Sequence, residues 1–188
     1  MALKLRILGS SSKGNSALLI SENAKVLVDA GFSAKKLGQL LQNAGESLDS
    51  IDAVFLTHEH QDHALGLRGL WKRPDLPIFA NRDTAEEVQR SLKTKLNWKY
   101  FTTGSVFSYK DLEVANFSVP HDAIDPVGFT FSSGENTLFS PVKTLAWCTD
   151  LGHVPQSIHE RIRYGYARII ATCLVFETTN QRAARAFE

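Results

Sequence analysis

The chain has 188 residues, of which 43% are hydrophobic and 22% are charged, and its formal net charge is +1. These values are ordinary for a globular protein and exclude a disordered or fibrous chain. A net charge so close to zero excludes a general positive field, so a nucleic-acid partner would have to be held by a local basic patch.

The cysteines and the amino terminus indicate the compartment. Cys148 and Cys173 lie in apolar surroundings without the close pairing of zinc ribbons or redox motifs, and we expect reduced, buried thiols. Residues 1–6 alternate apolar and basic side chains instead of forming the apolar core of a signal peptide, and no apolar run is long enough to span a membrane. We therefore expect a cytoplasmic protein without a membrane partner, and the sequence leaves its oligomeric state open.

Short apolar runs, helical spacing and capping residues predict the elements in chain order. The first half reads as strands at 3–7, 17–20 and 25–28, a helix from the cap Ser33 to Gly45, a buried strand at 51–56 and a helix at 65–71. There follow a strand at 78–80, a helix opened by a capping box at 83–86 and running to about Leu96, short strands between 98 and 131, a strand at 144–149, a polar helix at 156–163 and a strand at 169–176. The pattern predicts one domain over residues 1–188 with mixed sheets flanked by helices.

Three of the six histidines and one carboxylate follow the predicted strand 51–56, in the run His58-Glu59-His60-Gln61-Asp62-His63. Alternate side chains such as His58 and His60 can face one point, whereas Asp62 and His63 face a second point nearby. The spacing therefore predicts two neighbouring metal sites, and these ligands suit zinc as well as manganese or iron. The alternatives are a cluster of exposed histidines or one structural metal, although neither cysteine is near enough in sequence to close a structural site.

The run from Thr57 to His63 resembles the His-x-His-x-Asp-His signature of the metallo-β-lactamase-fold hydrolases. Val28-Asp29-Ala30-Gly31 resembles the strand-end Asp-x-Gly of the same superfamily, in which the aspartate orients the metal-binding loop. The resemblance covers residues 3 to about 177. It implies an α/β (α+β) fold, the αββα sandwich of two mixed β-sheets flanked by helices.

The resemblance also implies the remaining site residues. His121 is similar to the third histidine of the first metal site, and Asp150 is similar to the carboxylate that bridges both metals. With His58, His60, Asp62 and His63, these residues would hold two divalent ions, zinc above all, with manganese or iron as alternatives. Asp62 and His153 are the candidate catalytic residues. His153 would contact the substrate or donate a proton to the leaving group, or else support a metal ligand.

The segment Gly9 to Ser16 is a near miss to a phosphate-binding loop, with Asn15 where that motif has lysine. A strand-like run follows it instead of a helix, so we expect a loop beneath the metal centre; a plain Ser/Gly turn is the alternative.

Together these motifs are most similar to the YycJ-type branch of the superfamily. That branch implies hydrolysis of phosphodiesters in nucleic acid, as an exonuclease, by a metal-bound hydroxide. The alternatives are a thioesterase or lactonase with the same centre, or a catalytically impaired metal-binding remnant. The branch also supplies a further histidine to the second metal, and this sequence has no counterpart of it. We therefore expect the chain to lack the carboxy-terminal part of the fold.

Overall fold

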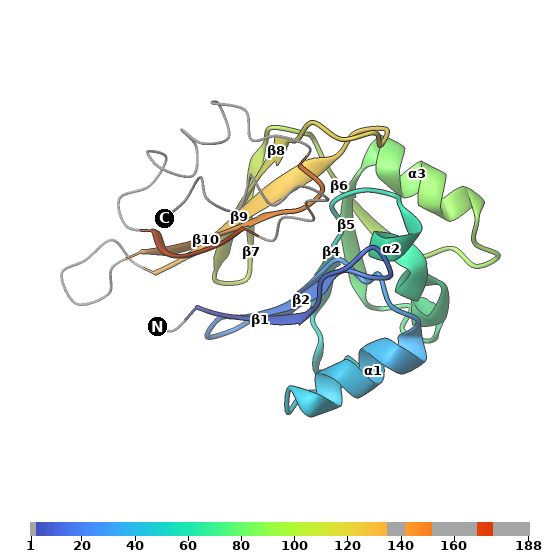
Figure 1. Ribbon diagram of the computed structural model, residues 1–188, viewed down its shortest axis with the longest axis horizontal. Helices are drawn as coiled ribbons and strands as arrows, with labels where there is room; N and C mark the ends of the chain where they lie inside the picture. Colours follow the sequence, from blue (N-terminus) through green and yellow to red (C-terminus); the bar gives the residue numbers. More distant parts are fainter. Residues whose placement is uncertain (1–2, 135–141, 152–168, 175–188) are drawn as a thin grey trace.

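The computed structural model describes residues 3–134, 142–151 and 169–174, and it places two β-sheets face to face (Figure 1). One sheet has six strands in the order β1-β2-β3-β4-β5-β6. The strands are β1 (Lys4–Gly9), β2 (Ser16–Ile20), β3 (Lys25–Val28), β4 (Ala53–Phe55), β5 (Pro77–Asn81) and β6 (Asn97–Phe101). Strands β1 to β3 pair antiparallel and β3 to β6 pair parallel, so the sheet is mixed.

The second sheet has five described strands in the order β11-β10-β9-β8-β7. They are β7 (Val106–Tyr109), β8 (Leu112–Ser118), β9 (Val127–Ser133), β10 (Lys143–Cys148) and β11 (Ile169–Leu174). Strands β7 to β10 are antiparallel, whereas β10 and β11 are parallel. The predicted sandwich of two mixed sheets is therefore confirmed.

The helices α1 (Ala34–Asn43), α2 (Gln61–Ala64) and α3 (Arg82–Arg90), with the 3-10 helices η1 (Leu48–Ser50) and η2 (Leu65–Lys72), complete the described elements. The helices α1 to α3 and η2 lie on the side of the six-stranded sheet that faces away from the other sheet (Figure 1). Within the described residues, none of these helices is long and apolar enough to cross a membrane. The helix predicted at 156–163 lies outside the described residues.

Two cores result from the alternation of side chains along the strands. In β2, Leu18 packs toward the helices, and Leu19 packs between the sheets. In β4, Val54 packs toward the helices, and Phe55 packs between the sheets. Successive strand residues point to opposite faces, so a sheet covered on both faces needs continuous apolar runs. This is the reason why these strands read as unbroken apolar segments.

The capping residues predicted from the sequence can be compared with the observed ones in two helices. Helix α1 has the predicted cap, since the Ser33 side chain accepts a hydrogen bond from the Lys36 N–H, and Gly45 follows its end with φ +79°. The predicted capping box of the next long helix was wrong. Asn81, at the end of β5, caps α3 by accepting from the Thr84 N–H, and the helix ends at Arg90 instead of near Leu96.

Candidate metal centre

The histidine run follows β4, at the edge where the two sheets meet. Because β3 and β4 are parallel neighbours, Asp29 and Thr57 emerge side by side from their carboxyl ends, the usual place for a site in such sheets. His58 continues the chain from β4, and α2 begins at Gln61, so the short helix carries Asp62 and His63. The loop between β8 and β9 brings His121 to the same edge.

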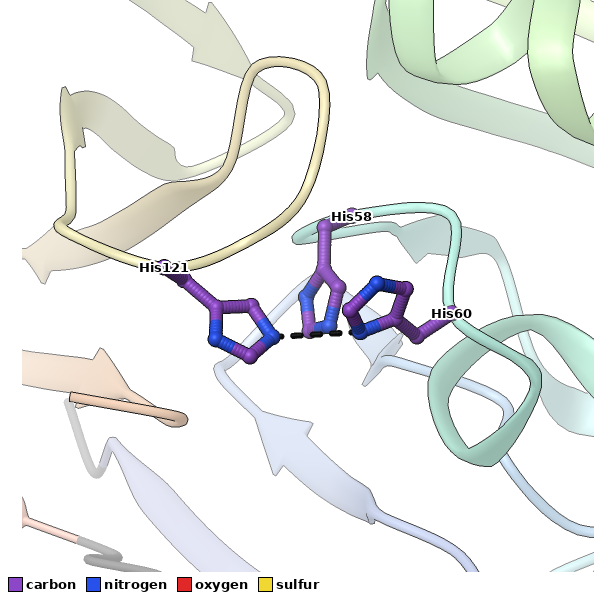
Figure 2. A group of neighbouring side chains, drawn as sticks. All are labelled: His58, His60 and His121. Atoms are coloured by element: carbon purple, nitrogen blue, oxygen red, sulfur yellow. Dashed lines mark hydrogen bonds between the residues drawn. The ribbon is translucent and has the colours of Figure 1, made fainter. Parts of the chain in front are cut away.

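Three imidazole rings converge from these two loops: His58, His60 and His121 (Figure 2). Each offers a ring nitrogen, and the three nitrogens lie within 4.8 Å of one another. His121 Nε2 is 3.1 Å from His60 Nδ1. His58 Nε2 is buried and has no hydrogen-bond partner among the described residues.

A second group shares His58 and adds His63 and Asp150. Asp150 Oδ2 lies 2.9 Å from His63 Nε2 and 3.9 Å from His58 Nε2. Asp62 contributes from the rim, with its Oδ2 atom 3.4 Å from His63 Nε2. The structure thus brings together all six residues that the sequence singled out as metal ligands, whereas His153 lies outside the described residues.

Asp29 is fully buried and fixes the orientation of the histidine run. Its carboxylate accepts hydrogen bonds from the Thr57 N–H at 2.8 Å and from the Thr57 hydroxyl at 2.9 Å. His63 Nδ1 lies 2.9 Å from Asp29 Oδ2. Because a carboxylate only accepts hydrogen bonds, His63 Nδ1 must carry the proton, and His63 Nε2 is the ring atom available to a metal.

Backbone strain is concentrated at this edge. Within the described part of the chain, the non-glycine residues with positive φ are Asp29 at 61°, Asp150 at 58° and Lys110 at 52°. Asp29 and Asp150 both contact the histidine run, while Lys110 lies in a hairpin turn. Strained backbone persists where the surroundings hold a functional side chain in place, which fits both aspartates.

The pKa values of these groups are pushed in opposite directions. Burial, reinforced by the nearby His63, lowers the pKa of His58 to about 2, so this ring is neutral and free to coordinate. Burial also opposes protonation of His63, but Asp29, Asp150 and Asp62 outweigh it and raise the pKa of His63 well above its ordinary value. A metal ion that binds His63 Nε2 would therefore displace a proton from that atom. Burial would raise the pKa of Asp150, but the contact with His63 outweighs it and lowers that pKa to about 2.

The donor set fits divalent metal ions. A buried imidazole nitrogen without a partner is costly unless something binds it, and His58 Nε2 is such an atom. Three imidazoles leave a fourth position open, as in catalytic zinc sites, and the group of His58, His63 and Asp150 adds a carboxylate. The structure therefore supports divalent metal binding here.

The loop from Gly9 to Ser16 lies against this centre, as expected. The Asn15 N–H donates to the Asp62 carbonyl at 2.7 Å, and Asn15 Nδ2 lies 3.1 Å from Asp62 Oδ2 and 3.0 Å from His63 Nε2. Gly31 allows this approach, because a Cβ atom there would lie 1.5 Å from the Asp62 carbonyl oxygen. The sequence predicted the position of this loop but not the contacts of Asn15.

The sequence did not predict two sets of contacts that hold the His121 loop in place. Glu59 Oε1 accepts a hydrogen bond from the Ile124 N–H at 2.9 Å, which ties the loop to the histidine run. Asp125 is held twice, since its carbonyl accepts from Asn81 Nδ2 and its carboxylate accepts from the Thr103 hydroxyl, both at 2.6 Å. No local pattern in the sequence signals these contacts.

Residues 24–182 match the family model described as the beta-lactamase superfamily domain. The chain belongs to the β-lactamase superfamily. Among superfamily relatives, exodeoxyribonuclease YycJ of Bacillus anthracis is 33% identical over 156 residues, which are 82% of this chain and 56% of that protein. Exodeoxyribonuclease WalJ of Streptococcus pneumoniae is 32% identical over 158 residues, with the same two coverages. The chain thus spans about half the length of these curated relatives.

A solved superfamily structure shows the same fold. It is MEM-A1, a subclass B3 metallo-β-lactamase isolated from a soil metagenome library. It matches with a TM-score of 0.63 and 19% identity, over 92% of this chain and 75% of the other. At this identity the likeness extends to the fold alone, and it confirms the predicted metallo-β-lactamase-like architecture.

Proposed function

We propose that this chain is a metal-dependent hydrolase of nucleic-acid phosphodiesters that acts as an exonuclease with two divalent ions, zinc or alternatively manganese or iron. The observation that carries the proposal is the pair of ligand groups that share His58. Sites so close together suit two neighbouring cations, and phosphodiester hydrolases use such pairs to stabilise both the attacking and the leaving oxygen.

In this proposal, the one free ring nitrogen of His58 would bind the ion that His60 and His121 also hold. His63 and Asp150 would hold the other ion together with Asp62, whose Oδ2 atom lies 3.4 Å from His63 Nε2. Ions bound there would supply Lewis-acid activation of water and neutralise charge on the phosphoryl group. Asp29 keeps the proton of His63 on Nδ1, and Asn15 keeps the carboxylate of Asp62 in place. His153 remains the proposed proton donor to the leaving group.

The names of the relatives support nucleic acid as the substrate, since YycJ and WalJ are both named exodeoxyribonucleases. This chain covers 56% of their length, and the substrate is accordingly part of the proposal. A nucleic-acid substrate also agrees with the cytoplasmic location expected from the sequence.

The test is hydrolysis of labelled single-stranded DNA by the purified chain loaded with zinc or manganese. His60→Ala should lose hydrolysis by a factor of a thousand or more and bind less metal, with an unchanged circular dichroism spectrum. Asp49→Ala is the control and should match the wild type, because the Asp49 side chain in η1 is 92% exposed. Full activity of His60→Ala, or turnover of a thioester but of no phosphodiester, would overturn the proposal.

A further inference from the structure

Two hollows lie side by side on the helical face of the six-stranded sheet. The hollow of about 180 Å³ begins at Glu59 and Gln61 in the histidine run and extends to Arg68 and to Ser91 after α3. The larger one, of about 360 Å³, extends from Arg68 and Ser91 to Trp71 and Lys93. Because Arg68, Ser91 and Leu92 line both hollows, the two adjoin along η2 and together are named the groove. Its near end is lined by Glu59 and Gln61, which are chain neighbours of the proposed metal ligands.

The far part of this groove combines an exposed aromatic ring with free cations. Trp71 is 52% exposed, although large apolar side chains are normally buried, and Lys72 Nζ lies 5.7 Å from the centre of its ring. Arg68 and Lys93 are exposed, and neither forms an ion pair within the described residues. The groove therefore offers a stacking surface and two unpaired positive charges.

Two carboxylates line the near end of the groove. Glu87 forms an ion pair with Arg90 on the same helix, whereas Glu59 accepts a hydrogen bond from the Ile124 N–H and keeps its negative charge. Within the described residues, neither carboxylate forms an ion pair with Arg68 or Lys93, farther along the groove. Since the net charge of the whole chain is only +1, this local patch is the kind of feature that an anionic partner would need.

We propose that this groove binds single-stranded nucleic acid and leads its end to the metal centre, an inference that rests on the proposed function. Unpaired bases stack on aromatic rings irrespective of sequence, and cations along the path contact the phosphates. Trp71 would stack one base, while Arg68 and Lys93 would each contact a phosphate. Inside a duplex both faces of each base are covered by neighbouring bases, so Trp71 favours single strands.

The test measures binding of a fluorescent phosphorothioate oligonucleotide, which resists cleavage, to the metal-loaded chain by anisotropy. Trp71→Ala should weaken binding about 5- to 150-fold, the range for loss of one stacked base, and Trp71→Phe should restore most of it. The double variant Arg68→Ala/Lys93→Ala should weaken binding and reduce the slope of log K against log salt by about 1.4 for two lost phosphate contacts.

Tyr100→Ala is the matched control. Tyr100 is 50% exposed beneath the Arg82 guanidinium, 4.8 Å from it, but it lines neither hollow. Wild-type affinity in Tyr100→Ala is expected. Unchanged affinity in both Trp71→Ala and the double variant, equal losses in Trp71→Ala and Tyr100→Ala, or an equal effect of Trp71→Ala on a hairpin duplex would each overturn the groove proposal.

Hydrolysis of bis(p-nitrophenyl) phosphate separates this inference from the proposed function. This small diester does not reach the groove, so Trp71→Ala should cleave it at the wild-type rate while its KM for single-stranded DNA rises. A wild-type chain that binds the oligonucleotide through Trp71 but cleaves neither substrate would contradict the hydrolase proposal and leave the groove standing. Cleavage of both substrates without any effect of Trp71→Ala would contradict the groove alone.

Discussion

The substitution Asp29→Asn tests whether the ring orientation of His63 controls metal binding. Asparagine has nearly the shape of aspartate and tolerates the positive φ of 61° at this position, so backbone strain does not change. Its oxygen can still accept from the Thr57 N–H, but its amide nitrogen then faces His63 Nδ1, which is 2.9 Å from the carboxylate in the native protein. Two donors cannot share this position, so His63 must move its proton to Nε2 or rotate away.

The magnitude follows from these contacts. Loss of the partner that orients a metal-binding histidine typically weakens metal binding about 10- to 100-fold. Such a factor corresponds to about 1.4–2.7 kcal/mol of binding free energy. Loss of a hydrogen bond to a charged acceptor lowers the free energy of unfolding by about 1.5–3 kcal/mol in the metal-free protein.

The assay is a zinc titration in competition with a chromophoric chelator, combined with urea unfolding of the metal-free protein. Asp111→Asn is the matched control, because Asp111 also accepts a hydrogen bond, from the Ser21 hydroxyl at 2.7 Å, but lies in the β7–β8 hairpin. It should lose stability without losing metal affinity. If Asp29→Asn bound zinc as tightly as the wild type, the proton position on His63 would not control metal binding.

Three further predictions concern other parts of the molecule. Burial raises the pKa of the Cys148 thiol to about 12, so mass spectrometry should find Cys148 unmodified by iodoacetamide until the protein is unfolded; modification of the native protein would contradict this. The hydrogen bond from Lys25 lowers the pKa of Glu46 below its ordinary 4.5. The contact with Lys25 therefore stabilises the folded protein fully above pH 4.5, and this stabilisation is lost as the pH falls through the pKa of Glu46 in the folded protein. In the variant Glu46→Gln, Tm should therefore decrease less on acidification than in the wild type. An equal decrease in Tm would show that Glu46 does not contribute to this pH dependence. Asp125→Ala frees the His121 loop from Thr103 and should weaken cobalt binding, followed by its visible absorption, about tenfold; an identical titration would show that the contact is dispensable.

The sequence predicted most strands because sheets that are buried on both faces need local apolar runs. It also predicted the position of the histidine run, since that run follows the short strand β4 directly. The start of α3 was wrong because two capping signals lie within three residues, and Asn81 at the end of β5 provides the cap.

What the sequence could not predict depends on contacts between distant residues. The hydrogen bond between Glu59 and Ile124 spans 65 residues, and the one between Asn81 and Asp125 spans 44. Neither has a periodicity or spacing by which it could be recognised. The groove has the same origin, because Trp71 and Lys93 become neighbours only when η2 and α3 pack on the same sheet.

The most direct test of the central claim is the number of divalent ions per chain, measured by elemental analysis, together with phosphodiester hydrolysis in the same sample. The proposal predicts close to two ions per chain and cleavage of single-stranded DNA that stops when a chelator removes them. One ion or none, without cleavage after addition of zinc or manganese, would contradict a binuclear hydrolytic centre in this chain.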